Sequence, residues 1–218
     1  MAKGELITGK GGWGVYFSLL SFCGLALIFS MPWATYVKEL LSFPWKPSPI
    51  VFFATYTLLV TIVGLNRGAA RAPAPNKGKG RIRTAIGEIL FAHLLLFPYL
   101  AYVRVLLPGR ESAIPLILGY LVGLSVSFGL FAYALESHRE RGRLDPFTVR
   151  YGAAVLAFGL PLFARLGGGR FIDLTYLSPF AAVRSILTAP LRPQIAIAFS
   201  LPLLLGGVSF AMMKRRER

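Results

Sequence analysis

Long apolar runs alternate along this chain with shorter segments that carry most of its charge. Six such runs cover residues 14–33, 50–65, 86–107, 113–135, 151–166 and 195–213. Each is close to the roughly 20 residues with which a helix crosses a hydrocarbon core of about 30 Å, although the second and fifth runs are short. The pattern predicts an all-α integral membrane protein, with six transmembrane helices in one transmembrane domain over residues 1–218.

The composition agrees with this pattern. Hydrophobic residues make up 55% of the chain and charged residues 15%, and the mean hydropathy is +0.62. A soluble domain carries about 25% charged residues. The 24 Lys and Arg residues outnumber the 9 Asp and Glu, but they lie almost entirely between the apolar runs and leave no basic face with interleaved aromatic side chains. We therefore expect contact with membrane lipids and no binding of nucleic acid.

The distribution of Lys and Arg also predicts the orientation of the helices, because basic residues are retained on the cytoplasmic side. With the N-terminus placed inside, sixteen of these residues fall in inside segments and eight in outside segments. Both termini are therefore expected in the cytoplasm.

Two inside segments are candidates for binding a soluble partner. Residues 136–150 carry both signs of charge, including Arg139, Glu140 and Arg141, and a docking surface and a solvated loop both remain open for them. Within this segment Asp145 followed by Pro146 predicts the start of a helix. Residues 66–84 include Arg81 and Arg83, and their Pro and Gly residues predict a basic connector without a long helix.

The outer segment 167–193 is longer and more apolar than a simple connection requires. Ser178 followed by Pro179 predicts a helix start, and Phe180, Val183, Ile186 and Leu187 then recur at helical spacing. The segment therefore predicts a short amphipathic helix, Pro179–Thr188, at the outer membrane surface.

Ionisable side chains inside the third run are functional candidates, because their burial in a membrane is costly. For Glu88, an ion pair near the membrane surface with Arg81 or Arg83 and a role in transport both remain open. For His93 the expectation is a hydrogen bond between helices. Haem held by two histidines is not expected, because the second histidine, His138, lies in a charged loop.

Small residues on the fourth run recur three to four positions apart, which permits close approach of a second helix within the chain or across a dimer. They are Gly119, Gly123, Ser127 and Gly129. Pro98, Pro161 and Pro202 interrupt other runs and predict kinks in the helices there. The single Cys23 excludes a disulfide framework and a cluster of thiolate metal ligands.

The order of crossings and loops is similar to that of the membrane subunit of type-2 ABC exporters. The likeness is greatest near the C-terminus, where Leu-Ser-Pro-Phe-Ala-Ala-Val (residues 177–183) precedes a last crossing that ends in Lys-Arg-Arg-Glu-Arg. This resemblance implies a permease subunit of the bacterial cytoplasmic (inner) membrane, without catalytic, cofactor or metal sites of its own. Its implied partners are a second permease, identical or related, and two ABC ATPase subunits that bind ATP and Mg.

The resemblance also assigns roles to particular residues. It places Phe52, Tyr56 and Phe163 on the wall of a translocation path, with Glu88 and His93 as further candidates, whereas packing against lipid is the alternative for the aromatic residues. Residues 66–84 lack the acids that such permeases carry at this point, so docking of the ATPase falls to Arg139, Glu140 and Arg141, with Arg81 and Arg83 beside them.

Two alternatives to an ABC exporter remain. One is an anchor or scaffold subunit of a larger membrane assembly, which transports nothing itself. The other is a permease similar to the haem exporters of cytochrome maturation. An enzyme is not expected, because the sequence contains no paired carboxylates, Ser/His arrangement or metal-ligand spacing. The cargo and the direction of transport are open.

Overall fold

The computed structural model describes residues 49–72, 82–106, 112–138, 145–166, 177–188 and 194–217, together with residues 16–18, 20, 21 and 24. All regular secondary structure in these described segments is helical. The part of the first apolar run that is described is helical, and its Tyr16 and Leu20 are buried against the other helices.

Two helices, α4 (Pro49–Arg71) and α7 (Ala113–Ser137), form the centre of the bundle. They cross where small residues of α4, Gly64 and Gly68, face Ser125 and Gly129 of α7. A Cβ atom added to Gly64 or Gly68 would overlap the backbone of α7, so only glycine permits this approach. The expected close contact of Gly129 is thus confirmed, and it lies within the chain.

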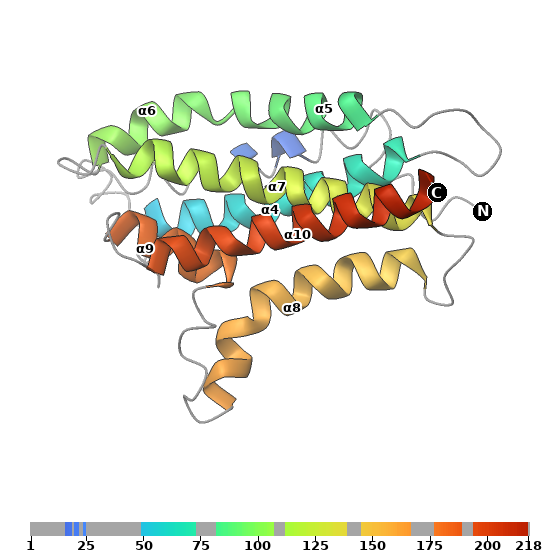
Figure 1. The fold of residues 1–218 in the computed structure, drawn as a ribbon. Coiled ribbons are helices and arrows are strands. Elements are labelled where there is room, and N and C mark those ends of the chain that lie inside the picture. Colours follow the sequence, from blue (N-terminus) through green and yellow to red (C-terminus); the bar gives the residue numbers. More distant parts are fainter. Residues whose placement is uncertain are drawn as a thin grey trace.

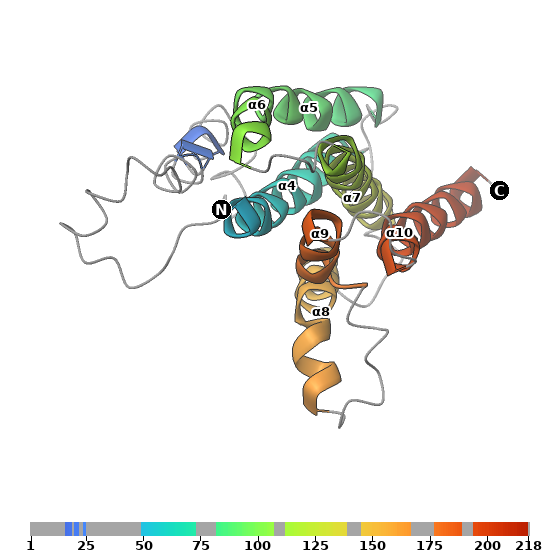
Figure 2. The ribbon, with the colours of Figure 1, turned by 90° about the vertical axis from the view of Figure 1, so that its left-hand side faces the viewer.

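The remaining helices lie on two sides of this central pair. On one side are α5 (Ile82–Leu94) and α6 (Phe97–Leu106), which follow each other along the bundle. On the other side are α9 (Pro179–Thr188) and α10 (Gln194–Glu217), as Figure 2 shows from the end. The helix α8 (Pro146–Leu166) lies outermost, and its C-terminal part leans away from the bundle (Figure 1).

Five of the described helices begin or end at the same end of the bundle. The helices α4, α7 and α10 end at one end of the bundle, and α5 and α8 begin there (Figure 1). The basic segments that follow α4 and α7 therefore start from the same end as the basic residues that close α10. We call this end, defined by Arg71, Ile82, Ser137, Pro146 and Lys214, the basic end.

Within the described residues, three helical stretches are long and apolar enough to cross a membrane. They are Ile82–Ala101, Ala113–Ser137 and Ile195–Lys214, and they correspond to the third, fourth and sixth predicted crossings. This part of the chain therefore has the character of an integral membrane protein. The helices α4 and α8 cover the second and fifth runs, and the total of six crossings remains a prediction.

Several helix boundaries differ from those predicted. The helix α4 continues to Arg71, six residues beyond the second run, and ends shortly before Pro73, because the residue that precedes a proline is disfavoured in a helix. The third run is interrupted at Leu95 and Leu96, so that Pro98 lies in the first turn of α6, where a missing N–H group costs no hydrogen bond. In contrast, Pro202 lies inside the uninterrupted helix α10.

The predicted start of α8 is confirmed, since Asp145 precedes the helix and its Oδ2 accepts a hydrogen bond from the Thr148 N–H at 3.3 Å. At the start of α9 the Ser178 carbonyl accepts the Ala182 N–H at 2.9 Å. The Ser178 hydroxyl, however, has no hydrogen-bond partner in the described part of the chain, so it makes no capping bond there.

A helix covers the predicted residues Pro179–Thr188, but the predicted apolar face was wrong in one member. The buried residues of α9 follow the spacing of one helical face: Pro179, Ala182, Val183, Ile186 and Leu187. Phe180 lies one position away from this face, is 37% exposed and packs edge to face against Phe158 of α8, with ring centroids 4.8 Å apart. The buried face packs against other helices of the chain, and the place of α9 at the outer membrane surface stays a prediction.

Candidate functional site

A chain of buried polar side chains connects helices inside the bundle. His93 of α5 lies between Tyr56 of α4 and Ser125 of α7: its Nε2 is 2.8 Å from Ser125 Oγ, and its Nδ1 is 3.4 Å from the Tyr56 hydroxyl. The Tyr16 hydroxyl lies 3.4 Å from that of Tyr56 and donates a hydrogen bond of 2.6 Å to the Ala92 carbonyl. We call Tyr16, Tyr56, His93 and Ser125 the histidine network.

An assignment of protons with a neutral His93 satisfies the polar groups of this network. Ser125 donates its hydroxyl proton to the Val122 carbonyl at 3.0 Å, so its oxygen is left to accept the Nε2–H of His93. Nδ1 of His93 is then the acceptor of the imidazole and faces the Tyr56 hydroxyl as donor. Each polar group is satisfied with a neutral histidine, as burial in an apolar bundle requires.

The sequence did not predict that a serine and a histidine would meet here. Their pairing resembles that of a nucleophile and its base, but the Ser125 hydroxyl also lies 3.0 Å from the Val122 carbonyl, which can accept its proton. Both side chains are also buried, with Ser125 at 0% and His93 at 4% exposure. The network therefore joins α4, α5 and α7 with the helical segment that carries Tyr16, and the hydrogen bond between helices expected for His93 is present.

Of the aromatic residues that the resemblance assigns to a translocation path, Tyr56 belongs to this network and Phe52 lies beside it. Phe52 stacks on Tyr56, with ring centroids 6.1 Å apart, and contacts Tyr99 of α6 at 5.6 Å. Both Phe52 and Tyr56 are completely buried among helices of the same chain. As placed, neither side chain has a surface for cargo, and a role in a path requires α4 and α5 to separate.

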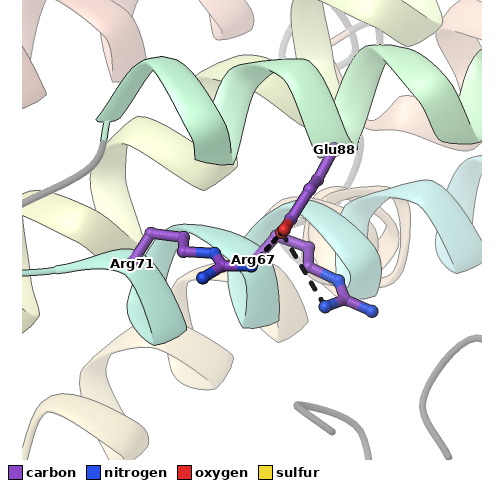
Figure 3. Close-up of polar contacts among 3 residues, drawn as sticks. All are labelled: Arg67, Arg71 and Glu88. Atoms are coloured by element: carbon purple, nitrogen blue, oxygen red, sulfur yellow. Dashed lines mark hydrogen bonds and ion pairs between the residues drawn. The ribbon is translucent and has the colours of Figure 1, made fainter. Parts of the chain in front are cut away.

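A cluster of charged residues lies between α4 and α5 near the basic end (Figure 3). Glu88 accepts a hydrogen bond from Arg71 Nη2, and its Oε2 lies 3.8 Å from Arg67 Nη1. The ion pair expected for Glu88 is therefore present, with arginines of α4 as its partners. Arg83 is not a partner, because it lies five residues away on α5 and so points in another direction, and it is exposed.

The same region fixes the start of α8 to α4. The Tyr151 hydroxyl donates a hydrogen bond of 2.9 Å to Asn66 Oδ1, and the Asn66 amide donates one of 2.9 Å to the Ile62 carbonyl. The guanidinium of Arg150 lies over the Tyr151 ring, 5.2 Å from its centroid. Asn66 thus has a defined place in the folded helix α4, although the sequence assigned it to a loop.

Other predicted site residues lie outside the described part of the chain. These are Arg81, Arg139, Glu140 and Arg141, and the side chain of Phe163. Their assigned roles stay predictions. Among the described residues, no three His, Cys, Asp or Glu side chains come close enough to hold a metal ion.

Residues that sequence reasoning missed are those whose partners come from another helix. The sequence places Asn66, Arg67 and Arg71 in a loop, and it indicates no role for Ser125 or Tyr16. The available signal was a polar residue within or directly after an apolar run, which identifies a candidate but does not name its partner.

We compared the chain with models of protein families, with curated proteins and with solved structures, and none of these comparisons gives a match.

Proposed function

We propose that this chain is the permease subunit of an ABC-type exporter in a bacterial cytoplasmic membrane, with both termini inside. In this proposal it forms half of a translocation path, and a second permease, identical or related, completes that path. Two separate ABC ATPase subunits bind ATP and Mg and drive the path between inward and outward openings. The chain itself carries out no catalysis.

The observation that supports this proposal is that several helix ends and the basic residues beside them lie at the same end of the bundle. The apolar bundle has one basic end, at which α4, α7 and α10 end and α5 and α8 begin. A cytoplasmic ATPase acts on a permease by pressing on such an end, and the charged segments there join α4 to α5 and α7 to α8. A force applied to these segments acts on four helices at once.

In the same proposal, the Glu88 ion pairs near the basic end and the histidine network deeper in the bundle hold the translocation path closed. Both sets of contacts join α4 to α5, and the network also reaches α7. Exposing Phe52 and Tyr56 to cargo requires breaking these contacts. The free energy that the ATPases supply when they bind ATP has to exceed the cost of leaving these polar groups unpaired in the membrane interior.

A second candidate is a scaffold or anchor subunit that transports nothing. The complete burial of Phe52 and Tyr56 favours it, because a conduit normally presents its wall residues to cargo. In a scaffold the same contacts serve only to keep the bundle rigid, and the basic end binds a soluble partner that does not hydrolyse ATP.

Replacement of Arg139, Glu140 and Arg141 together by alanine tests the proposed docking. The full-length tagged chain is purified from its host membrane in mild detergent, and the amount of ATPase that accompanies it is measured. We expect the triple variant to lose at least nine-tenths of the ATPase, whereas Arg184→Ala, on α9 away from the basic end, keeps it. Retention of the ATPase by the triple variant contradicts the docking role, and absence of any ATPase from the unmodified chain favours the scaffold.

A further inference from the structure

We propose that the exposed face of α5 that carries Arg83, Gly87, Leu90 and Leu94 is a binding site for one anionic phospholipid. The phosphate of this lipid binds Arg83. The inference goes beyond the transport proposal and does not rest on it. It concerns Arg83, which takes no part in the ion cluster of Glu88, and an apolar face that no other described helix covers.

The charge at the start of α5 is the first part of the argument. Glu88, the acidic residue of this helix, is directed toward α4 and engaged by Arg67 and Arg71. Arg83 is exposed, and in the described part of the chain it has no acidic partner. Its guanidinium is therefore available for the phosphate of a ligand, to which two parallel N–H donors bind well.

The apolar surface next to Arg83 is the second part. Leu90 and Leu94 lie on the same face of α5 as Arg83, at seven and eleven residues from it, and they are 43% and 57% exposed. Phe97 continues the exposed surface at the start of α6, with 53% exposure. In both views α5 and α6 form an edge of the bundle, with α8, α9 and α10 on the opposite side (Figures 1 and 2).

Between the charge and the apolar side chains lies Gly87. A Cβ atom built on this glycine meets no other atom within 4 Å, so the face is open at this point. Gly87 follows Arg83 by one helical turn and precedes Leu90 by three residues. The gap leaves room for the glycerol region of a lipid between the phosphate on Arg83 and an acyl chain on Leu90 and Leu94.

The dimensions of this face match half of a bilayer. The fourteen residues from Arg83 to Phe97 span about 21 Å at 1.5 Å per residue. Half of a bilayer, with its headgroup region, is about 20–22 Å thick. A lipid whose phosphate lies at Arg83 therefore has its acyl chains along Leu90 and Leu94 and their ends near Phe97, and charge and apolar length together select an anionic phospholipid over a free phosphate.

Native mass spectrometry of the full-length chain tests the proposal. The protein is purified in mild detergent, exchanged into micelles with equal amounts of phosphatidylglycerol and phosphatidylcholine, and the ratio of the two bound lipids is measured. We expect the unmodified chain to select phosphatidylglycerol. Arg83→Gln should lower this selectivity about fivefold, the factor that one basic residue contributes at a membrane surface. Arg83→Lys should keep most of the selectivity.

Two further variants separate a specific site from general attraction to positive charge. Gly87→Leu fills the gap without removing charge and should reduce the bound phosphatidylglycerol to the level of Arg83→Gln. Arg184→Gln removes one charge from an exposed position of α9 and should leave the ratio unchanged. All three positions are exposed, and thermal unfolding of each variant checks that its fold is intact.

The proposal is overturned if Arg83→Gln binds the two lipids in the same ratio as the unmodified chain, or if Arg184→Gln lowers the ratio equally. It is also overturned if inorganic phosphate displaces the phosphatidylglycerol at equal concentration, because the acyl chain then contributes nothing to binding. The proposal is supported if Arg83→Gln and Gly87→Leu lose the selectivity for phosphatidylglycerol while Arg184→Gln keeps it.

Discussion

Gly68 of α4 lies directly against Gly129 of α7, so closely that a Cβ atom added to Gly68 would overlap the carbonyl oxygen of Gly129. One turn earlier, Gly64 contacts the backbone of Ser125 in the same way. This small-xxx-small contact brings the two central helices close enough for the side chains around it to meet, including Ser125 and the His93 that bonds to it.

Gly68→Ala is therefore expected to destabilise the fold by about 1–3 kcal/mol, because the helices have to separate to admit the methyl group. Unfolding by sodium dodecyl sulfate in mixed micelles measures the free energy of unfolding. Gly119→Ala on α7 is the matched control, since nothing lies within 4 Å of its added Cβ atom. We expect this variant to be neutral, or more stable by about 0.5–1 kcal/mol from the higher helix propensity of alanine. Equal stability of the two variants contradicts the close contact.

The hydrogen bond between His93 and Ser125 predicts a measurable coupling. In a double-mutant cycle with His93→Phe and Ser125→Ala, we expect a coupling free energy of about 0.5–1.5 kcal/mol, the range found between polar side chains of membrane helices. Ser127→Ala is the control partner, because Ser127 Oγ lies on the side of α7 that faces Gly206 of α10. A coupling of Ser127 to His93 as large as that of Ser125 would refute the network as described.

Glu88 is the centre of its ion cluster, so its loss should cost more than the loss of Arg71, the more exposed of its two partners. Glu88→Gln removes the carboxylate from between Arg67 and Arg71, and we expect a destabilisation of about 1–3 kcal/mol. The value is reduced from that of a fully buried pair, because Glu88 is 20% exposed and Arg71 35%. Arg71→Gln should cost less than Glu88→Gln, since Arg67 still faces the carboxylate. The reverse order of stability is incompatible with the cluster.

The orientation of the chain in the membrane is tested at the two ends of α7. In a Cys23→Ser background, Ser112→Cys and Ser137→Cys each place one thiol at opposite ends of this helix. A membrane-impermeant maleimide added to intact cells should label Ser112→Cys but reach Ser137→Cys only after permeabilisation. Labelling of both thiols from outside shows that α7 does not cross the membrane, and the opposite pattern reverses the predicted orientation.

These relationships also mark how far the sequence alone leads. The long apolar run 113–135 predicted the extent of α7 to within two residues, because a continuous apolar run of this length is long enough to cross a membrane as one helix. The helical extension of α4 to Arg71 was missed, because Asn66 and Arg67 look like loop residues until Tyr151 and Glu88 are placed beside them. The partners of His93 come from positions 37 and 32 residues away, and only the packing of three helices fixes them.

The partners of Glu88 also come from another helix: they are Arg67 and Arg71 of α4, where the sequence predicted Arg81 or Arg83. Sequence distance favoured Arg83, but five residues on a helix correspond to a rotation of about 140°, which turns the two side chains apart. Arg67 and Arg71 are four residues apart on α4 and share one face, so a single carboxylate meets both. Proximity along the chain was a poor guide here, whereas helical periodicity was a good one.

The most direct test of the transport proposal is the identity of whatever accompanies the chain out of its native membrane. The tagged full-length protein is extracted in mild detergent, and its partners are identified and counted by mass spectrometry, with ATP hydrolysis measured on the same sample. We predict a stoichiometric subunit with a Walker A loop and ATP hydrolysis that depends on it. Repeated recovery of other membrane or surface proteins, with no ATPase among them, contradicts the permease and leaves the scaffold.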